Sequence, residues 1–189
     1  MAAKQLRSTY QLKITLNGAK PPIWRRLLLT SDTKLNTLHL AIQISMGWKD
    51  SHLHQFMDSN QTFYGRPDPD FDDIKLADES KFRLSQLLQT EKDGLLYEYD
   101  FGDGWQHKII LEKILPFDAQ KKLPYCVTGK RACPPEDCGG IWGYTDLLEI
   151  LANPEHEEYA NMIDWLGGEF DPTYLNRREI NQRLLEYCR

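Results

Sequence analysis

Short stretches in which bulky apolar and polar residues alternate fill much of the first two thirds of the chain. Residues 10–16 and 23–29 both alternate in this way, and the segment between them contains Gly18 and two prolines. Successive side chains of a β-strand point to opposite faces of a sheet, so alternation predicts strands, and glycine and proline between them predict a turn. We therefore expect residues 10–29 to form a β-hairpin.

Two further strand pairs follow the same pattern. Residues 51–57 and 61–64 predict one pair, and residues 95–101 and 105–111 predict another. Short strands that follow one another with tight turns between them are typical of antiparallel sheets. We therefore expect a mainly antiparallel sheet built from hairpins.

The turn Gly102-Asp103-Gly104 sets the expected register of the last of these hairpins. A three-residue turn places six large side chains on one face of the sheet, where alternation predicts that they are buried. The expected cross-strand pairs are Phe101 with Trp105, Tyr99 with His107, and Tyr97 with Ile109.

Helical spacing of apolar residues appears once early in the chain and repeatedly in its last third. Residues 38–46 carry one apolar face, with Asn36 as the expected N-cap and Gly47 as the expected end. A short helix is expected near residues 84–88. Further helices are expected to begin near Thr145, at residue 159 after Asn153-Pro154, and at Asp171-Pro172.

Strands gathered early and helices gathered late predict an α+β fold, with the sheet packed against the early helix. We expect one domain over residues 1–189, because a chain of this length can bury a single sizeable core. Its expected parts are a sheet-rich region with one helix (10–115), a cysteine- and proline-rich loop (116–142) and a helical region (143–189).

Charge and hydropathy narrow the classes of partner. The formal net charge is −5 and the sequence pI is about 5.5, so binding to nucleic acid would need a local basic patch. No apolar run is long enough to cross a bilayer, and the first residues lack the apolar core of a signal peptide. We therefore expect a cytoplasmic protein that does not associate with membranes.

Three of the four cysteines, Cys126, Cys133 and Cys138, fall within one short segment. Clustered thiols in a reducing compartment point to zinc or to packing before disulfides. Their spacing is wider than that of common zinc motifs, and a fourth ligand such as His107 would have to come from elsewhere. Zinc is therefore one hypothesis for these cysteines, and a rigid proline turn with thiols packed beneath it is the other.

His52 and His54 lie two residues apart in an expected strand, which places both imidazoles on the same side. With His107 and an acid such as Asp103, they could hold a metal ion that activates water, while a carboxylate takes the proton. The alternative is that these histidines simply form part of an amphipathic sheet face.

The segment 65–79 is polar and broken by prolines, and it predicts a surface loop. Its acids partly match the spacing of a calcium-binding loop, but the position that requires glycine is Asp73, and a lysine follows. We interpret the segment as a solvated acidic loop. The acids that match the template are Asp68, Asp70, Asp72 and Glu79.

Four phrases occur in order along the chain: P-P-I-W-R-R from Pro21, G-W-K-D-S-H-L-H-Q-F from Gly47, Y-E-Y-D-F-G-D-G-W-Q-H from Tyr97, and C-P-P-E-D-C-G-G from Cys133. Together they resemble the Ri-plasmid ORF-three-like family over residues 10–151. The resemblance implies a fold family of uncharacterised proteins, some of which are labelled resolvase-like or are associated with mobile elements.

The sequence contains no complete set of nucleophile, base and acid, so its molecular function is unknown at this stage. We interpret the protein as a cytosolic interaction or accessory module that binds protein or nucleic acid through one groove. The alternative is a metal-dependent, hydrolase-like enzyme with a histidine-based site. The expected groove residues are Trp24, Arg25, His52, His54, Asp103, Trp105 and His107.

Overall fold

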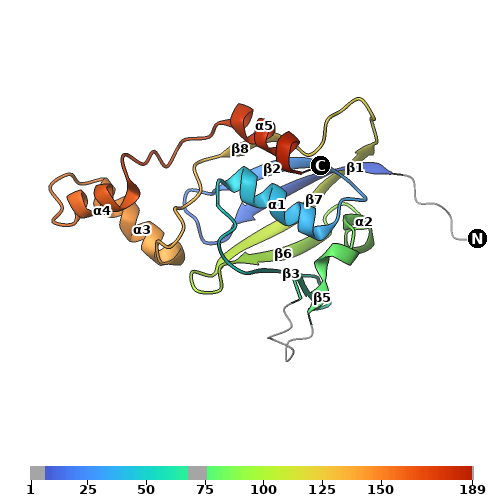
Figure 1. Cartoon of the computed structure of the whole chain (residues 1–189), viewed down its shortest axis with the longest axis horizontal. Helices are drawn as coiled ribbons and strands as arrows, with labels where there is room; N and C mark the ends of the chain where they lie inside the picture. The colour runs from blue at the N-terminus through green and yellow to red at the C-terminus, as the bar shows by residue number, and fades with distance from the viewer. Residues whose placement is uncertain (1–6, 68–75, 189) are drawn as a thin grey trace, which may run out of the picture.

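The computed structural model describes residues 7–67 and 76–188 (Figure 1). Eight strands form one sheet in the order β5-β4-β3-β6-β7-β1-β2-β8, and every pair is antiparallel except β4 with β5. The predicted α+β class with a mainly antiparallel sheet is therefore confirmed. The strands are β1 (Ser8–Leu16), β2 (Trp24–Thr30), β3 (His54–Met57), β4 (Phe63–Gly65), β5 (Ala77–Asp78), β6 (Gly94–Tyr99), β7 (Trp105–Pro116) and β8 (Tyr125–Lys130).

The predicted hairpin of β1 and β2 is present, with Ile14 opposite Arg25. Buried and partly exposed side chains alternate along both strands, so one sheet face carries Leu12, Ile14 and Leu27 into the core. The helices that cover this face are α1 (Leu35–Met46) and α5 (Arg177–Tyr187), which contact each other (Figure 1). We call it the covered face and the opposite one the open face.

The predicted register of β6 with β7 is wrong by two residues. Tyr99 lies opposite Trp105, and Tyr97 lies opposite His107. The connection spans five residues because the Asp100 carboxylate accepts the N–H groups of Gly102 and Asp103 and closes a longer turn. A shift of two residues keeps each side chain on its predicted face, so the aromatic side chains are still buried there; only Phe101, outside the strand, is exposed.

Helix α1 begins at Leu35, earlier than the predicted Asn36 cap, and ends as predicted at Gly47, which has a left-handed φ of 100°. The short helix α2 (Leu84–Leu87) is also present and follows the 3-10 turn η1 (Glu79–Lys81). Within the described ranges, no helix combines the length and the apolarity that a membrane span requires.

Two segments predicted as loops contain strands. Strand β8 lies within the predicted loop 116–142 and pairs with β2 at the edge of the sheet, where α5 packs on it. Strand β5 and the start of η1 lie within the predicted loop 65–79. Asp68, Asp70 and Asp72 of the calcium-like pattern lie outside the described residues. Both strands were missed because they lie at the two edges of the sheet, where little apolar surface is buried.

The helices α3 (Gly140–Leu151) and α4 (Tyr159–Leu166) project from one end of the sheet (Figure 1). The predicted end of α4 at Gly167 is confirmed, but α3 begins earlier than Thr145, and α5 begins later than Pro172, with Asn176 as its N-cap. Glycine is required at Gly143 because a Cβ atom there would lie 1.9 Å from the Cys138 carbonyl oxygen. The absence of a side chain at Gly143 therefore lets the Cys138 backbone lie close to the first turn of α3.

Candidate metal centre

Two histidines from consecutive elements, α1 and β3, stack face to face on the covered side of the sheet. His39 comes from α1 and His54 from the first position of β3, and their ring centroids lie 3.4 Å apart with an interplanar angle of 5°. His39 is buried, and the His54 side chain is only 9% exposed. Such a contact holds two titratable rings in a fixed arrangement.

Each ring of this stacked pair has its own carboxylate. His39 Nε2 lies 2.8 Å from Asp50 Oδ1, and His54 Nε2 lies 2.9 Å from Glu79 Oε2. One ligand atom from each of His39, Asp50 and His54 falls within 4.8 Å of the others. The cluster borders an open cavity of about 590 Å³. Its remaining lining residues are Asn36, Leu40, Ser51, His52, Leu53 and Arg66.

A closed ring of hydrogen bonds orients His39. The Asp50 backbone N–H donates to Gln43 Oε1, so the Gln43 amide nitrogen donates to the Tyr97 hydroxyl. That hydroxyl donates in turn to His39 Nδ1, which leaves the His39 proton on Nε2, where it donates to Asp50. The ring therefore points His39 Nε2 at a carboxylate beside the cavity.

Burial lowers the pKa of His39 to about 4, and the neighbouring His54 acts in the same direction, whereas Asp50 opposes the change. His39 is therefore neutral at physiological pH, the state in which imidazole binds metal ions. Burial also raises the pKa of Tyr97 well above its usual range, so its hydroxyl keeps its proton.

We expect the Tyr97→Phe variant to lose between about 1 and 3 kcal/mol of unfolding free energy for each buried group that it leaves without a partner. Those groups are His39 Nδ1 and the Gln43 amide. Urea denaturation measures the loss. Tyr64→Phe is the control, because Tyr64 Oη donates to the partly exposed Asp58, which water can reach when the hydroxyl is removed, and it should lose less. Equal losses in both variants would contradict the ring.

A second group of ligand atoms lies on the same side of the molecule. His52 Nε2 is 3.3 Å from Asp137 Oδ1 and 3.8 Å from Asp100 Oδ2, and His52 also lines the cavity. The two histidines that were predicted to act together therefore belong to different clusters. They separate because β3 begins at His54, and His52 precedes it in a bend.

Three aspartates of the two clusters occupy strained backbone positions. Asp50, Asp100 and Asp137 have φ values of 58°, 57° and 60°, and they are three of six non-glycine residues with positive φ in the described part of the chain. Such positions are uncommon for side-chain-bearing residues and gather at functional sites. Their convergence on His39, His52 and His54 marks this region as the candidate site.

The cysteine segment packs against the same region. Tyr99 Oη donates to Glu136 Oε1 at 2.5 Å, and Trp48 Nε1 donates to the Pro134 carbonyl at 2.9 Å. Asp103 Oδ2 accepts the Gly139 N–H at 3.2 Å. The second, third and fourth signature phrases therefore meet in space, although Trp48 and Pro134 are 86 residues apart in the sequence.

The three thiols of that segment do not meet at one point. Among the described residues, two groups of three or more His, Cys, Asp or Glu side chains bring their ligand atoms within 4.8 Å of one another, and neither contains a cysteine. Burial raises the pKa of Cys138 to about 12 and also raises the pKa of Cys126 and Cys133. Cys126 and Cys133 are buried and Cys138 is partly buried, and protonated thiols of this kind suit packing better than metal binding.

His107 and Trp105 lie in the core. Both side chains are fully buried, and the Tyr97 ring lies between His107 and the stacked histidines, with centroid distances of 5.5 Å to His107 and 5.9 Å to His39. His107 is therefore not a member of either cluster. Its Nδ1 lies 3.1 Å from the Trp105 carbonyl oxygen.

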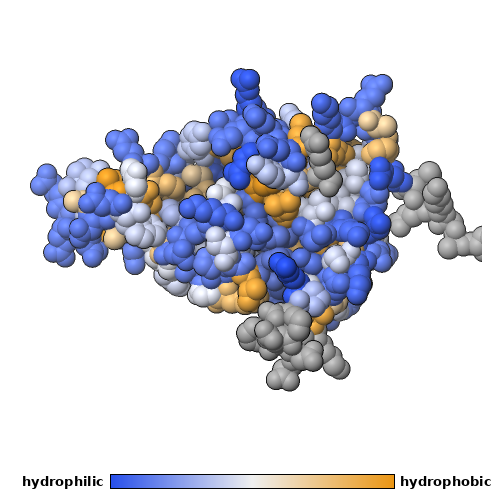
Figure 2. Space-filling view, in the orientation of Figure 1, coloured by the Kyte–Doolittle hydropathy of each residue, from blue (hydrophilic) through white to orange (hydrophobic). Residues whose placement is uncertain are grey.

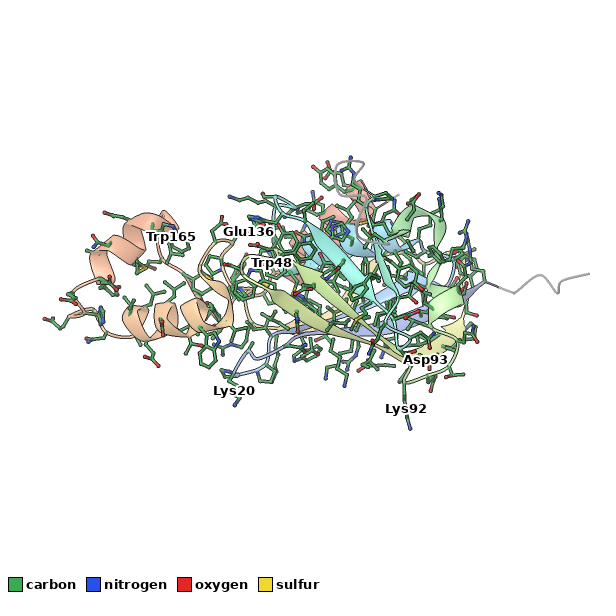
Figure 3. The ribbon with its side chains drawn as sticks, turned by 90° about the horizontal axis from the view of Figure 1, so that it is seen from below. Lys20, Trp48, Lys92, Asp93, Glu136 and Trp165 are labelled. Atoms are coloured by element: carbon green, nitrogen blue, oxygen red, sulfur yellow. The ribbon has the colours of Figure 1, made fainter. Side chains whose placement is uncertain are left out.

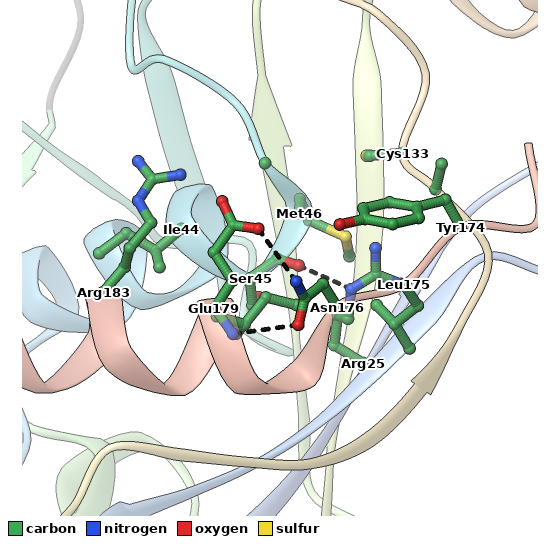
Figure 4. Close-up of a pocket in the computed structure, with 13 residues that line it drawn as sticks. Arg25, Ile44, Ser45, Met46, Cys133, Tyr174, Leu175, Asn176, Glu179 and Arg183 are labelled. Carbon is green, nitrogen blue, oxygen red and sulfur yellow. Dashed lines mark hydrogen bonds between the residues drawn. The ribbon is translucent and has the colours of Figure 1, made fainter. Parts of the chain in front are cut away.

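The remaining predicted groove residues do not share one surface. Arg25 is 1% exposed and donates to the carbonyls of Trp24, Ser45 and Lys130. Its guanidinium borders a separate cavity of about 180 Å³. Figure 4 shows Arg25 there next to Ser45 and Tyr174. Trp24 lies on the open face, and Asp103 lies in the β6–β7 turn.

His39, Asp50, Gln43 and Tyr97 were not predicted as site residues. One signal could have found two of them: His39 and Gln43 lie four residues apart and so share a face of α1, on the side that is buried. A polar pair on a buried helix face needs partners. The partners come from β6 and from the residues after α1, which only the fold brings together.

Comparison with known proteins supports the family resemblance. The model of the family described as plasmid pRiA4b ORF-3-like protein matches residues 8–179. A relative named uncharacterized protein y4hQ, from Sinorhizobium fredii, is 35% identical over 176 residues, which cover 93% of this chain and 90% of that protein.

A solved structure is similar over the same extent. The protein of unknown function MM3350 from Methanosarcina mazei has a TM-score of 0.82 and 41% identity, and the match covers 93% of this chain and 98% of that one. None of these descriptions states a molecular function. Because the family match spans most of the residues and includes both histidine clusters, this chain belongs to the family of plasmid pRiA4b ORF-3-like proteins.

Proposed function

We propose that the stacked histidine cluster binds one divalent transition-metal ion and that the protein is a metal-dependent, hydrolase-like enzyme. The observation that supports this is the meeting of two imidazoles and two carboxylates at the wall of an open cavity. Two histidines and one carboxylate, with a fourth position left for water, form a common ligand set of catalytic zinc sites.

The donor set suits zinc or a similar ion. His39, His54 and Asp50 supply the three ligands, and the Tyr97 hydroxyl supports the far nitrogen of His39. That hydroxyl can accept a hydrogen bond from Nδ1–H when Nε2 serves as the ligand, because a hydroxyl both donates and accepts. A bound ion of this kind would supply a water molecule that ionises near neutral pH.

Glu79 is suited to the proton transfer. It is buried at 6% exposure beside His54, on the side that faces the cavity. A buried carboxylate next to the ligands can take a proton from the attacking water. Arg66 lines the same cavity and favours a substrate with negative charge.

Cobalt(II) titration tests the metal site, because cobalt bound in place of zinc absorbs visible light. We expect one ion per chain in the wild type, and at least about 100-fold weaker binding in His39→Gln and His54→Gln. His52→Gln is the matched control: it removes a histidine of the same cavity but no proposed ligand, and it should bind within a few-fold of the wild type.

Circular dichroism establishes that each variant is folded. A folded wild-type protein that does not retain cobalt or zinc on dialysis would contradict the metal site, and so would unchanged binding in both ligand variants. Loss of binding in the His52 variant alone would assign the metal to the second cluster instead.

The enzymatic half of the proposal needs a separate test. The zinc-loaded protein is expected to hydrolyse bis(p-nitrophenyl) phosphate. Glu79→Gln should lower kcat at saturating zinc, because Glu79 is assigned to proton transfer, and it should also weaken zinc binding, because Glu79 lies within hydrogen-bond distance of the proposed ligand His54. Bound zinc without hydrolysis of phosphate diesters or carboxylate esters would contradict the catalytic role.

We propose a cytoplasmic location, which the four free cysteines support, since thiols stay reduced there. Binding to nucleic acid has less support from the geometry than the metal site has. Arg25 is buried against carbonyl groups, and Trp24 and Arg26 lie on the opposite face of the sheet from the histidines. An interaction role has support from a different surface, the helices α3 and α4.

A further inference from the structure

The charges of this chain are divided unevenly along the sequence. Residues 132–176 contain ten Asp and Glu residues and no Lys or Arg. The other 144 residues hold all 23 Lys and Arg against the remaining 18 Asp and Glu. We call the helical part of the acidic segment, α3 and α4 with their connection (residues 140–166), the acidic arm.

The acidic arm also exposes aromatic surface. Trp142 on α3 is 84% exposed and Trp165 on α4 is 48% exposed, and α4 has no buried residue. Figure 2 shows apolar surface among the polar residues of this projecting end, and Figure 3 shows Trp165 on α4, away from the sheet. Exposed tryptophans on a projecting helix pair are typical of an interaction surface.

A cavity of about 250 Å³ lies between the two helices. Its apolar lining includes Leu147, Ile150 and Met162, and the carboxylates of Asp137 and Asp146 also border it. The arm therefore combines an apolar pocket with a negative rim, which calls for a partner surface that is both aromatic or aliphatic and positively charged.

The open face of the sheet provides such a surface on the same chain. Trp24 lies there with Lys13 Nζ 5.2 Å and the Arg26 guanidinium carbon 5.1 Å from its ring centroid. Because Arg26 is paired with Glu112 on this face, Lys13 and Lys108 are the cations assigned to the docking contact. Thr15 lies opposite both Trp24 and Lys108, so Lys108 is on the same face two strands away. The helices α1 and α5 lie on the other face and leave this one uncovered (Figure 1).

We propose that two copies of the chain form a reciprocal dimer in which the acidic arm of each copy docks on the open face of the other. Opposite charge favours this arrangement, whereas contact between two arms would bring like charges together. A two-fold axis lets both contacts form at once and closes the assembly. The arrangement does not depend on the metal site, which lies on the covered face.

Sedimentation equilibrium of the full chain tests the dimer. We expect a dimer at low salt and weaker association at about 1 M salt, where the Debye length falls to about 3 Å. Lys13→Glu with Lys108→Glu should raise the dimer dissociation constant at least about tenfold, and so should Asp146→Lys with Glu149→Lys on α3.

Combining all four substitutions restores opposite charge with the signs exchanged, and it should recover most of the lost affinity. A variant that merely damaged the fold would not be rescued in this way. The control is Lys34→Glu with Lys81→Glu, which changes the net charge equally at exposed positions near α1 and should leave the dissociation constant unchanged. A wild-type protein that is monomeric at low salt would overturn the dimer. The dimer would also be overturned if the fourfold variant associated more weakly than either double variant.

Discussion

Replacing Arg25 with methionine is expected to destabilise the protein by about 3–5 kcal/mol, and replacing it with lysine should cause at least half of that loss. The guanidinium holds three carbonyl groups from β2, β8 and the end of α1, at distances of 2.7 to 3.0 Å. A lysine ammonium is a single point of charge and cannot reach all three acceptors. Urea denaturation of the folded variants measures the loss.

Arg26 provides a matched control at the next position. It points to the open face, where it forms a salt bridge with Glu112, and both side chains remain over 20% exposed. The pair is bidentate but partly exposed to solvent, so Arg26→Lys should cost about 1 kcal/mol, clearly less than the loss expected at Arg25. Equal losses for lysine at the two positions would contradict the structural role assigned to Arg25.

Arg25 also shows what local patterns can and cannot predict. Alternation in β2 correctly implies that Arg25 and Arg26 point to opposite faces. The alternation does not show that Arg25 bonds the final turn of α1, because that contact depends on how the helix crosses the sheet. The predicted common groove for Trp24, Arg25 and His54 failed for this reason.

The sheet was largely predictable because its hairpins are local. Each of the pairs β1–β2 and β6–β7 joins neighbours in sequence, and the burial of alternate residues fixes the faces. The predicted register of β6 with β7 was wrong by two residues because the Asp100 side chain bonds the backbone of the turn. These bonds stabilise a five-residue turn in place of the expected three-residue one. Edge strands escaped prediction because only Cys126 of β8 is fully buried.

The candidate site was only half predictable. His52 and His54 drew attention because they lie two residues apart, yet their partners are Asp137 and Glu79, which are distant in sequence. His39 is hidden in an amphipathic helix, where a histidine is usually part of the packing. A cluster that combines α1, β3 and η1 can be assigned only after the fold has brought these elements together.

Lowering the pH from about 7 to about 5 is expected to cost the protein about 2 kcal/mol of unfolding free energy through His107 alone. Complete burial lowers the pKa of His107 to about 3, and the nearby Arg25 charge acts in the same direction. Below the ordinary histidine pKa of about 6.5, His107 is protonated in the unfolded chain but stays neutral in the folded chain. Stability therefore falls by about 1.4 kcal/mol per pH unit between these two values and is unaffected by this group above them.

The His107→Leu variant isolates this contribution because leucine does not titrate. Its own stability at neutral pH is irrelevant to the test, since the measurement is the difference between the pH profiles of the two proteins in urea denaturation. The profiles should run parallel above about pH 7, and the wild type should fall more steeply toward about pH 4. Parallel profiles over the whole range would contradict the prediction, because they would mean that His107 is protonated in the folded protein as readily as in the unfolded chain. The ring would then have solvent or an acceptor beside Nε2, which has no hydrogen-bond partner within the described residues.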